Sequence, residues 1–246
     1  MEKKRLHYIV NHMDDFLFEW SLYEYLQISK YMKSSDRSTF ILANYDKILH
    51  FNDPKFISLN KTNISLLPQS SSLLFLEKDI NDYLVEKEDI LSFKKEVFPK
   101  KRVCLLDFRA EKTLEPQDEE EFDVFIFGGI LGDHPPRDRT STLRMKSYPI
   151  RNLGKLQLST DTAVLVTKLI VENKIPIEKI PFIEEPEFKK EGSNGESIVI
   201  EGFRYVSKKI KYEDGKEGEG KEGEVHMHEE IRNRLLFKEL DINDFM

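Results

Sequence analysis

Short apolar runs alternate with longer amphipathic stretches along this chain. The short runs have the length of β-strands and are bounded by polar residues. They predict strands at Leu6–Val10, Thr39–Asn44, Val103–Asp107, Asp123–Phe127 and Leu143–Ile150. The fourth of these runs is apolar at consecutive positions, so it predicts a strand that is buried on both faces.

The amphipathic stretches predict helices. A long helix is expected from about Phe16 to Met32, with Asp14 and Asp15 as candidate caps. A second helix is expected over Thr160–Asn173, where the apolar face includes the stem of Lys168. Shorter helices are expected near Asp79–Val85 and over Ile231–Leu240. Strands that alternate with helices indicate an α/β fold with a parallel sheet.

Length and composition favour one globular domain over residues 1–246. The chain has 246 residues, of which 39% are hydrophobic and 34% charged. Residues 213–224 consist almost wholly of Glu, Gly, Lys and Asp, which predicts a mobile segment of low complexity. The apolar runs are too short to cross a bilayer, and the sequence does not open with a leader peptide, so we expect a cytoplasmic protein. The single cysteine, Cys104, lies in an apolar run and is expected to be a buried thiol.

The charge of the chain favours a basic partner over a nucleic acid. The formal net charge is −7, which disfavours non-specific binding to a polyanion. Four arginines, at 137, 139, 144 and 151, still leave room for a local basic patch.

The glycines locate a candidate ligand site. None occurs before Gly128, four lie between Gly128 and Gly154, and seven lie between Gly192 and Gly223. Gly128 and Gly129 follow a buried strand, and ligands bind at the carboxyl ends of such strands in open α/β sheets. Gly132 adds a third glycine, which favours ligand contact over a purely structural turn. The run does not match the dinucleotide fingerprint, because Phe127 occupies the place of its first glycine.

The neighbouring polar residues have both functional and structural interpretations. The run 133–140 contains two prolines and alternating charges, and it fits a presented loop and a solvated loop equally. Thr160 and Asp161 are candidate caps of the helix that they open. Glu19 precedes Trp20, the only tryptophan in the sequence. The structural interpretation of this pair is that Trp20 packs in the core while the Glu19 side chain points into solvent.

Two kinds of chemistry find little support. His134 has no second histidine or cysteine nearby at a ligand spacing, and His226 and His228 are expected in solvent, so no metal site is predicted. The sequence also lacks a nucleophilic serine in a glycine-flanked turn and a histidine near Cys104, which disfavours acyl transfer.

Three stretches together resemble the SPOUT methyltransferases, and within them the branch of the yeast-type ribosomal-protein arginine methyltransferase. The first stretch is Tyr8–Met13 with Glu19 and Trp20, and the second is Phe127–Thr140. The third is Arg151–Gly154 with Thr160–Lys168. Pro181–Ile183, Pro186–Phe188 and Phe203–Val206 also look like later segments of the family, whereas residues 28–122 show little similarity.

The resemblance implies a fold and a cofactor site. The fold is a Rossmann-like parallel sheet whose C-terminal half forms a trefoil knot, a rare exception to unknotted topology. The cofactor is S-adenosylmethionine, bound without metal between two walls of the knot. The first wall carries over to Gly129, Ile130, Leu131 and Gly132, and the second to Leu153, Gly154, Leu156, Leu158 and Thr162.

The resemblance also implies methylation of an arginine in a small-subunit ribosomal protein, by a monomeric enzyme. A guanidinium keeps its proton at neutral pH, so its methylation needs carboxylates that orient it and accept a proton. Glu19, Asp133 and Asp138 are the candidates. Two alternatives stay open at this point: an RNA methyltransferase acting on rRNA or tRNA, and a ribosome-assembly protein that binds the cofactor without turnover.

Overall fold

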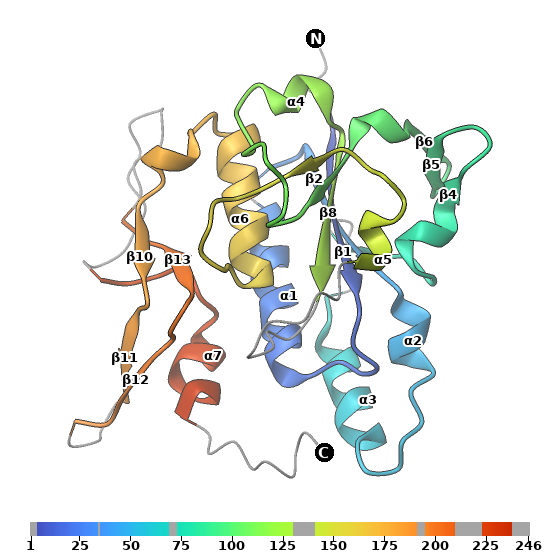
Figure 1. The fold of residues 1–246 in the computed structure, drawn as a ribbon. Coiled ribbons are helices and arrows are strands. Elements are labelled where there is room, and N and C mark those ends of the chain that lie inside the picture. Colours follow the sequence, from blue (N-terminus) through green and yellow to red (C-terminus); the bar gives the residue numbers. More distant parts are fainter. Residues whose placement is uncertain are drawn as a thin grey trace.

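The core of the protein is a six-stranded parallel sheet in a computed structural model that describes residues 4–33, 35–68, 73–129, 141–190, 195–209 and 223–237. The strand order is β3-β2-β1-β8-β7-β9 (Figure 1). The strands are β1 (Leu6–His12), β2 (Ser38–Ala43), β3 (Leu73–Phe75), β7 (Val103–Leu106), β8 (Val124–Gly129) and β9 (Ile150–Arg151). The expected α/β fold with a parallel sheet is therefore confirmed. The knot would involve residues 130–140, which lie outside the described residues, so it stays a prediction.

Helices α1 (Glu19–Met32) and α6 (Thr160–Val171) lie side by side against one face of the sheet (Figure 1). Even-numbered residues of β1, such as Tyr8 and Val10, point into this layer, and Phe125 and Phe127 of β8 do the same. The remaining helices are shorter. They are α2 (Tyr45–Leu49), α3 (Ile57–Leu66), α4 (Asp118–Glu121), α5 (Ser141–Arg144) and α7 (Glu229–Asn233).

The other face of the sheet is covered by α5 and by a small antiparallel sheet. Its three strands are β4 (Leu84–Val85), β5 (Ile90–Phe93) and β6 (Glu96–Pro99). Ile9, Val124 and Ile126 pack on this side, where they form a second core with Leu91 and Leu143. Strand β8 is thus buried on both faces, as its continuous apolar run predicts.

The C-terminal segment packs on the outer side of α1 and α6 (Figure 1). It contains two short hairpin sheets, β10 (Phe182–Glu184) with β13 (Arg204–Val206) and β11 (Glu187–Lys189) with β12 (Ser197–Val199). Tyr205 and Met227 form a third apolar cluster there, against which Trp20 and Tyr23 of α1 pack. Single 3₁₀ turns in the described residues lie at Ile80–Tyr83, Lys100–Arg102, Ile177–Lys179 and Leu235–Phe237.

The first helix begins at Glu19 instead of Phe16, and the expected caps Asp14 and Asp15 are not its N-cap. Tertiary contacts explain this difference. The backbone N–H of Leu17 donates to Asn60 Oδ1 at 2.9 Å, and its carbonyl accepts from Asn63 Nδ2 at 2.8 Å. These side chains of α3 bind the backbone groups of Leu17, and the segment before Glu19 therefore stays outside the helix.

The predicted strand Leu143–Ile150 is wrong over most of its length. Its first residues belong to α5, and Ser147 adopts a φ of 56°, which ends any regular element there. Only Ile150 and Arg151 pair with β7. The apolar residue Leu143 is buried, as a strand residue would be, but it reaches the core from a helical turn.

Two other short elements also differ from the sequence prediction. Asp79 caps a single 3₁₀ turn that leads directly into β4, where a helix was expected. The last helix begins at Glu229, earlier than predicted, and residues 238–246 lie outside the described residues. Cys104 is fully buried, as expected. None of the helices in the described residues is both long and apolar enough to cross a membrane.

A buried ion pair connects α6 to the first two strands. Lys168 Nζ lies 2.8 Å from Glu172 Oε2 and 2.7 Å from the hydroxyl of Ser38 in β2. Tyr8 of β1 donates to Glu172 Oε1 at 2.6 Å, and Ser38 donates to the same oxygen at 2.7 Å. Burial alone would raise the pKa of Glu172, but these donors and the ammonium together hold it below its usual value. The sequence placed only the stem of Lys168 against the core, whereas its ammonium is buried too.

We expect Glu172→Gln to destabilise the fold by about 3 kcal/mol, because it leaves the buried ammonium of Lys168 without its counterion. Urea unfolding followed by circular dichroism measures this change. The control is Glu196→Gln, which removes the exposed ion pair with Lys190 and is expected to change stability by about 1 kcal/mol or less. Equal effects of the two variants would contradict a structural role for the buried pair.

Candidate active site

Strands β1 and β8 end next to each other at the carboxyl edge of the sheet. His12 and Gly129, the last residues of these strands, are paired, and the N–H of Met13 donates to the carbonyl of Gly129 at 2.9 Å. His12 Nδ1 lies 2.7 Å from the hydroxyl of Tyr25 in α1. Burial lowers the pKa of His12 to about 4, so this ring is neutral at physiological pH.

Gly129 has no space for a side chain. A Cβ there would lie 2.5 Å from Val10 Cγ1 and 2.8 Å from the hydroxyl of Tyr25. The end of β8 therefore contacts α1 closely, so Gly129 has a structural explanation, whereas the ligand contact that the glycine run predicts stays a prediction.

The segment between β9 and α6 is held by the side chain of Asn152. Its amide nitrogen donates to the carbonyl of Ala110 at 2.8 Å. Its amide oxygen accepts from the N–H of Gly154 at 2.9 Å and from the hydroxyl of Thr113 at 3.1 Å. Sequence reasoning did not assign a role to Asn152. Three bonds from one side chain fix the turn that contains two of the predicted cofactor residues, Leu153 and Gly154.

Arg204 of β13 packs against the same turn. Its guanidinium donates to the carbonyl of Leu153 at 2.6 Å and lies 3.8 Å from the centre of the Phe182 ring. Gly154 has a φ of +92°, and a Cβ at this residue would collide with the guanidinium. Arg204 therefore fixes the turn from outside, and it was missed as a site residue although Phe203–Val206 was part of the resemblance.

The turn continues into the first residues of α6, which face α1. Glu24 of α1 is 4% exposed and Asp161 of α6 is 2% exposed. Glu24 accepts hydrogen bonds from the backbone and hydroxyl of Thr160 and, at 3.3 Å, from Trp20 Nε1. Burial raises the pKa of Glu24 and raises that of Asp161 to about 6. Asp161 accepts from Ser159, the N-cap residue, and from the N–H of Thr162 inside the first turn.

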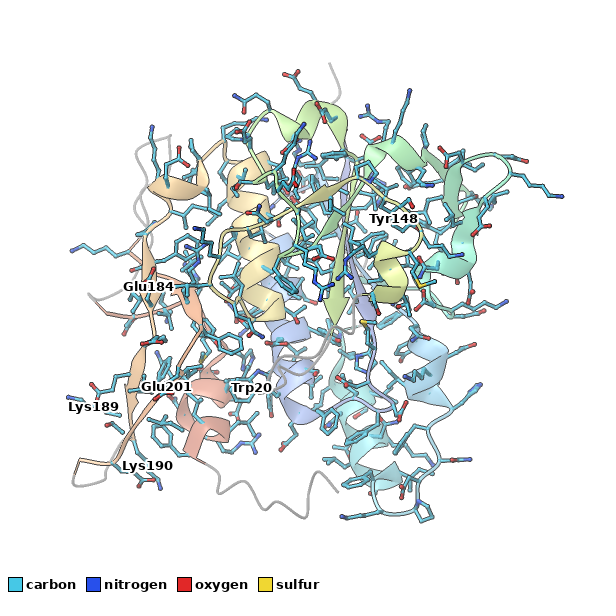
Figure 2. The ribbon with its side chains drawn as sticks, viewed as in Figure 1. Trp20, Tyr148, Glu184, Lys189, Lys190 and Glu201 are labelled. Carbon is cyan, nitrogen blue, oxygen red and sulfur yellow. The ribbon has the colours of Figure 1, made fainter. Side chains whose placement is uncertain are left out.

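Glu19, the predicted catalytic carboxylate, lies on another face of α1. Its Oε1 is 3.0 Å from Arg234 Nη2, and the same guanidinium nitrogen donates to the hydroxyl of Tyr23 at 3.1 Å. Glu19 thus forms an ion pair with the C-terminal segment instead of pointing alone into water. Trp20, its neighbour in sequence, lies on the side of α1 that faces this segment (Figure 2).

The structure brings most of the described site residues into one region. Leu153, Gly154, Leu156, Leu158 and Thr162 belong to one continuous segment, and Thr162 is fully buried. Helix α1 lies between Gly129 and this segment: the hydroxyl of Tyr25 packs against Gly129, and the adjacent Glu24 accepts hydrogen bonds from Thr160. The remaining predicted residues lie outside the described residues: Ile130, Leu131, Gly132, Asp133 and Asp138.

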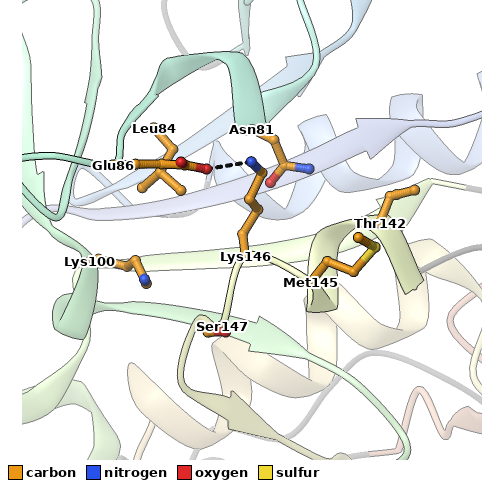
Figure 3. Close-up of a pocket in the computed structure, with 8 residues that line it drawn as sticks. All are labelled: Asn81, Leu84, Glu86, Lys100, Thr142, Met145, Lys146 and Ser147. Atoms are coloured by element: carbon orange, nitrogen blue, oxygen red, sulfur yellow. Dashed lines mark hydrogen bonds and ion pairs between the residues drawn. The ribbon is translucent and has the colours of Figure 1, made fainter.

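A cavity of about 560 Å³ lies elsewhere, between the small antiparallel sheet and the segment that includes α5 (Figure 3). Leu84, Lys100 and Met145 line it, and Lys146 and Glu86 form an ion pair at 2.5 Å in its wall. It contains none of the predicted site residues. The predicted site residues lie instead near the carboxyl edge of the parallel sheet.

The histidines near the C-terminus are more enclosed than predicted. His228 is 7% exposed, stacks on Tyr23 with ring centres 4.8 Å apart, and accepts from the N–H of Glu230 at the start of α7. Burial lowers the pKa of His226 to about 4. Within the described residues, no three side chains of His, Cys, Asp or Glu are grouped so that they can hold a metal ion.

The structure defines an α/β protein with a parallel central sheet, and comparison with known proteins identifies the family. The model of the SFM1-like family, described as protein arginine N-methyltransferase SFM1-like, matches residues 7–218. The chain belongs to this family.

Relatives with known structures agree with this assignment. Protein arginine N-methyltransferase SFM1 of Saccharomyces cerevisiae is 37% identical over 203 residues, which cover 81% of this chain and 85% of the relative. The crystal structure of the yeast arginine methyltransferase SFM1 complexed with SAM has a TM-score of 0.63 and 34% identity, covering 87% of this chain and 86% of the other. The complex with SAH gives 0.62 and 36%, with 85% and 89% covered.

Proposed function

We propose that this protein transfers a methyl group from S-adenosylmethionine to an arginine of a basic small-subunit ribosomal protein. Membership of a family of protein arginine N-methyltransferases carries the general assignment, since the match spans residues 7–218. The ribosomal substrate rests on the sequence resemblance and on the acidic net charge of −7. A cytoplasmic, monomeric enzyme is part of the same proposal.

The described residues fit S-adenosylmethionine. Backbone groups recognise an adenine when no side chain intervenes, and Gly154 provides such a position with its φ of +92°. Leu156 and Leu158 are partly buried beside it and offer apolar contacts, while Thr162 lies one turn further along. We infer that these residues and Gly129 hold the cofactor together with Ile130, Leu131 and Gly132.

Bound S-adenosylmethionine supplies a methyl group on a positively charged sulfur, so the protein mainly has to position and deprotonate the acceptor. A substrate guanidinium enters as a cation, and desolvation makes a nearby carboxylate necessary. Glu19 is suited to this role because it lies beside Trp20 near the molecular surface, and Asp133 and Asp138 remain further candidates. Arg234 holds the carboxylate of Glu19 in the absence of substrate.

Two of the four arginines that would serve an RNA substrate are engaged inside the protein. Arg144 Nε lies 2.7 Å from Asp107 Oδ2. Arg151 Nη2 lies 2.8 Å from Asp118 Oδ1, and its guanidinium stacks over the ring of Phe122. These contacts favour a structural role for both residues and support a protein substrate.

The substrate class is tested by incubating the enzyme with radiolabelled S-adenosylmethionine and ribosomes from cells that lack it. We expect label on one small-subunit protein, at arginine after acid hydrolysis. Label on rRNA would contradict the protein substrate. Cofactor binding without transfer to either component would identify a ribosome-assembly protein instead of an enzyme.

Gly154→Ala is expected to weaken binding of S-adenosylmethionine by about tenfold or more, because the new Cβ displaces Arg204 and distorts the turn. Gly202→Ala is the matched control, since its φ of +76° imposes similar backbone strain but its Cβ meets nothing within 4 Å. Isothermal calorimetry with both variants measures the difference. Equal losses would assign the effect to backbone strain alone.

Glu19→Gln is expected to reduce methyl transfer by about 100-fold while cofactor affinity changes by less than about twofold, because the amide removes the charge and keeps the shape. Steady-state kinetics with saturating cofactor measure kcat and KM. Arg234→Met provides the comparison, because it breaks the same ion pair and leaves the carboxylate. A similar loss in both variants would show that Glu19 only anchors α7.

A further inference from the structure

Glu24 and Asp161 form a buried pair of carboxyl groups between α1 and α6. Their exposed fractions are 4% and 2%, and each comes from a different helix. Among the described residues, no lysine or arginine pairs with either of them. Buried carboxyl groups in proteins normally have a cationic partner or a full set of hydrogen-bond donors.

Glu24 has a sufficient structural explanation. Thr160 donates both its backbone N–H and its hydroxyl to this carboxylate, and Trp20 donates its indole N–H. These bonds cap the first turn of α6, where the helix dipole also favours a negative charge. The position of Glu24 therefore does not by itself indicate a ligand.

Asp161 is different, because only one of its two oxygens is satisfied. Oδ1 accepts from the hydroxyl of Ser159 at 2.6 Å and from the N–H of Thr162 at 2.8 Å. Oδ2 is buried and has no hydrogen-bond partner among the residues that the structure describes. Ser159 and Thr162 hold the carboxylate in one orientation, so the free oxygen is fixed in place and ready to accept from a donor outside the described residues.

The surroundings of Asp161 have the chemistry of a guanidinium site. Tyr205 is 2% exposed and binds Ser159 through its hydroxyl, and its pKa is raised by burial and, to a smaller extent, by the charge of Asp161. Trp20 is the partly exposed member of the group and connects it to the surface on the side facing α7 (Figure 2). Aromatic rings beside two carboxyl groups suit a planar cation that stacks and donates several hydrogen bonds.

Asp161 also lies close to the expected methyl donor along the chain. It follows Leu158 by three residues and precedes Thr162, and both are predicted cofactor contacts. Helix α6 continues directly from the turn that Asn152 and Arg204 hold, so the position of Asp161 is coupled to that of the cofactor segment.

We propose that Asp161 binds the guanidinium of the substrate arginine through Oδ2 and accepts its proton, whereas Glu19 only attracts and orients the cation and Glu24 fixes the first turn of α6. The inference rests on the proposed function. As the bond between the guanidinium nitrogen and the methyl carbon forms, the carbon–sulfur bond breaks and sulfur keeps its electron pair. The nitrogen releases one proton to the Asp161 carboxylate, so charge and atoms balance.

The decisive variant is Asp161→Asn, compared with wild type in three measurements. Methyl transfer, as kcat/KM for the protein substrate, is expected to fall by about 100-fold or more. Affinity for S-adenosylhomocysteine is expected to stay within about twofold. The melting temperature at pH 7.5 is expected to be equal or higher, because burial raises the pKa of Asp161 to about 6 and the folded enzyme carries an unfavourable charge at this pH.

Asp123→Asn is the matched control. Asp123 is largely buried and is paired with Lys4 and Arg102, and it precedes β8 at the amino edge of the sheet, opposite to the carboxyl edge that carries the predicted site residues. We expect this variant to melt at a lower temperature and to keep its turnover per folded molecule. A lower melting temperature for Asp161→Asn with turnover retained would overturn the proposal, and so would a large loss of S-adenosylhomocysteine affinity, which would assign Oδ2 to the ammonium of the cofactor.

A binding experiment keeps this proposal separate from the proposed function. N-acetyl-arginine amide is titrated into the enzyme saturated with S-adenosylhomocysteine and followed by NMR, with the neutral N-acetyl-citrulline amide as the reference ligand. We expect the arginine probe to bind wild type and to lose at least tenfold in affinity in Asp161→Asn. Absence of methyl transfer by wild type would refute the proposed function, whereas equal binding of the probe to both proteins would refute the role of Asp161.

Discussion

The contact between the first turn of α6 and the middle of α1 determines how the active site is arranged. Thr160 donates two hydrogen bonds to Glu24, and the buried carboxylate lies at the positive end of α6. Helix α1 follows β1, and α6 follows the turn at Gly154, so this one contact sets the position of the turn relative to the edge of the sheet. The adjacent residue Tyr25 meets Gly129 at the end of β8, which brings the second half of the site to the same helix.

The two ends of α6 show how burial of charge serves stability in one place and function in another. At the C-terminal end, Glu172 accepts from Tyr8, Ser38 and Lys168, and its charge is fully compensated. At the N-terminal end, Asp161 keeps one oxygen without a partner at comparable burial. A carboxylate in this state opposes folding, and its presence is explained when a cationic ligand supplies the missing donors.

The C-terminal segment packs against two of the predicted site residues, Leu153 and Glu19. Arg204 binds the carbonyl of Leu153, and Tyr205, the next residue, packs near Asp161. Arg234 forms an ion pair with Glu19, so the same segment also contacts this partly exposed candidate carboxylate. A change in this segment would therefore act on the predicted site residues through two arginine contacts. One is the contact of Arg204 with Leu153, and the other is the contact of Arg234 with Glu19.

The sequence alone determined the parallel sheet and the family, and it predicted the region of the site. Consecutive apolar residues at 124–127 can be buried only in a strand covered on both faces, and the glycines that follow mark the ligand edge, because these signals are local. Tertiary structure alone decided where α1 begins, because this depends on hydrogen bonds from Asn60 and Asn63. It also decided that residues 143–149 do not form a strand, since the positive φ of Ser147 ends any regular element there. Asp161 is only a candidate helix cap in the sequence, and the tertiary structure buries it beside α1 and β13 with Oδ2 unpaired among the described residues.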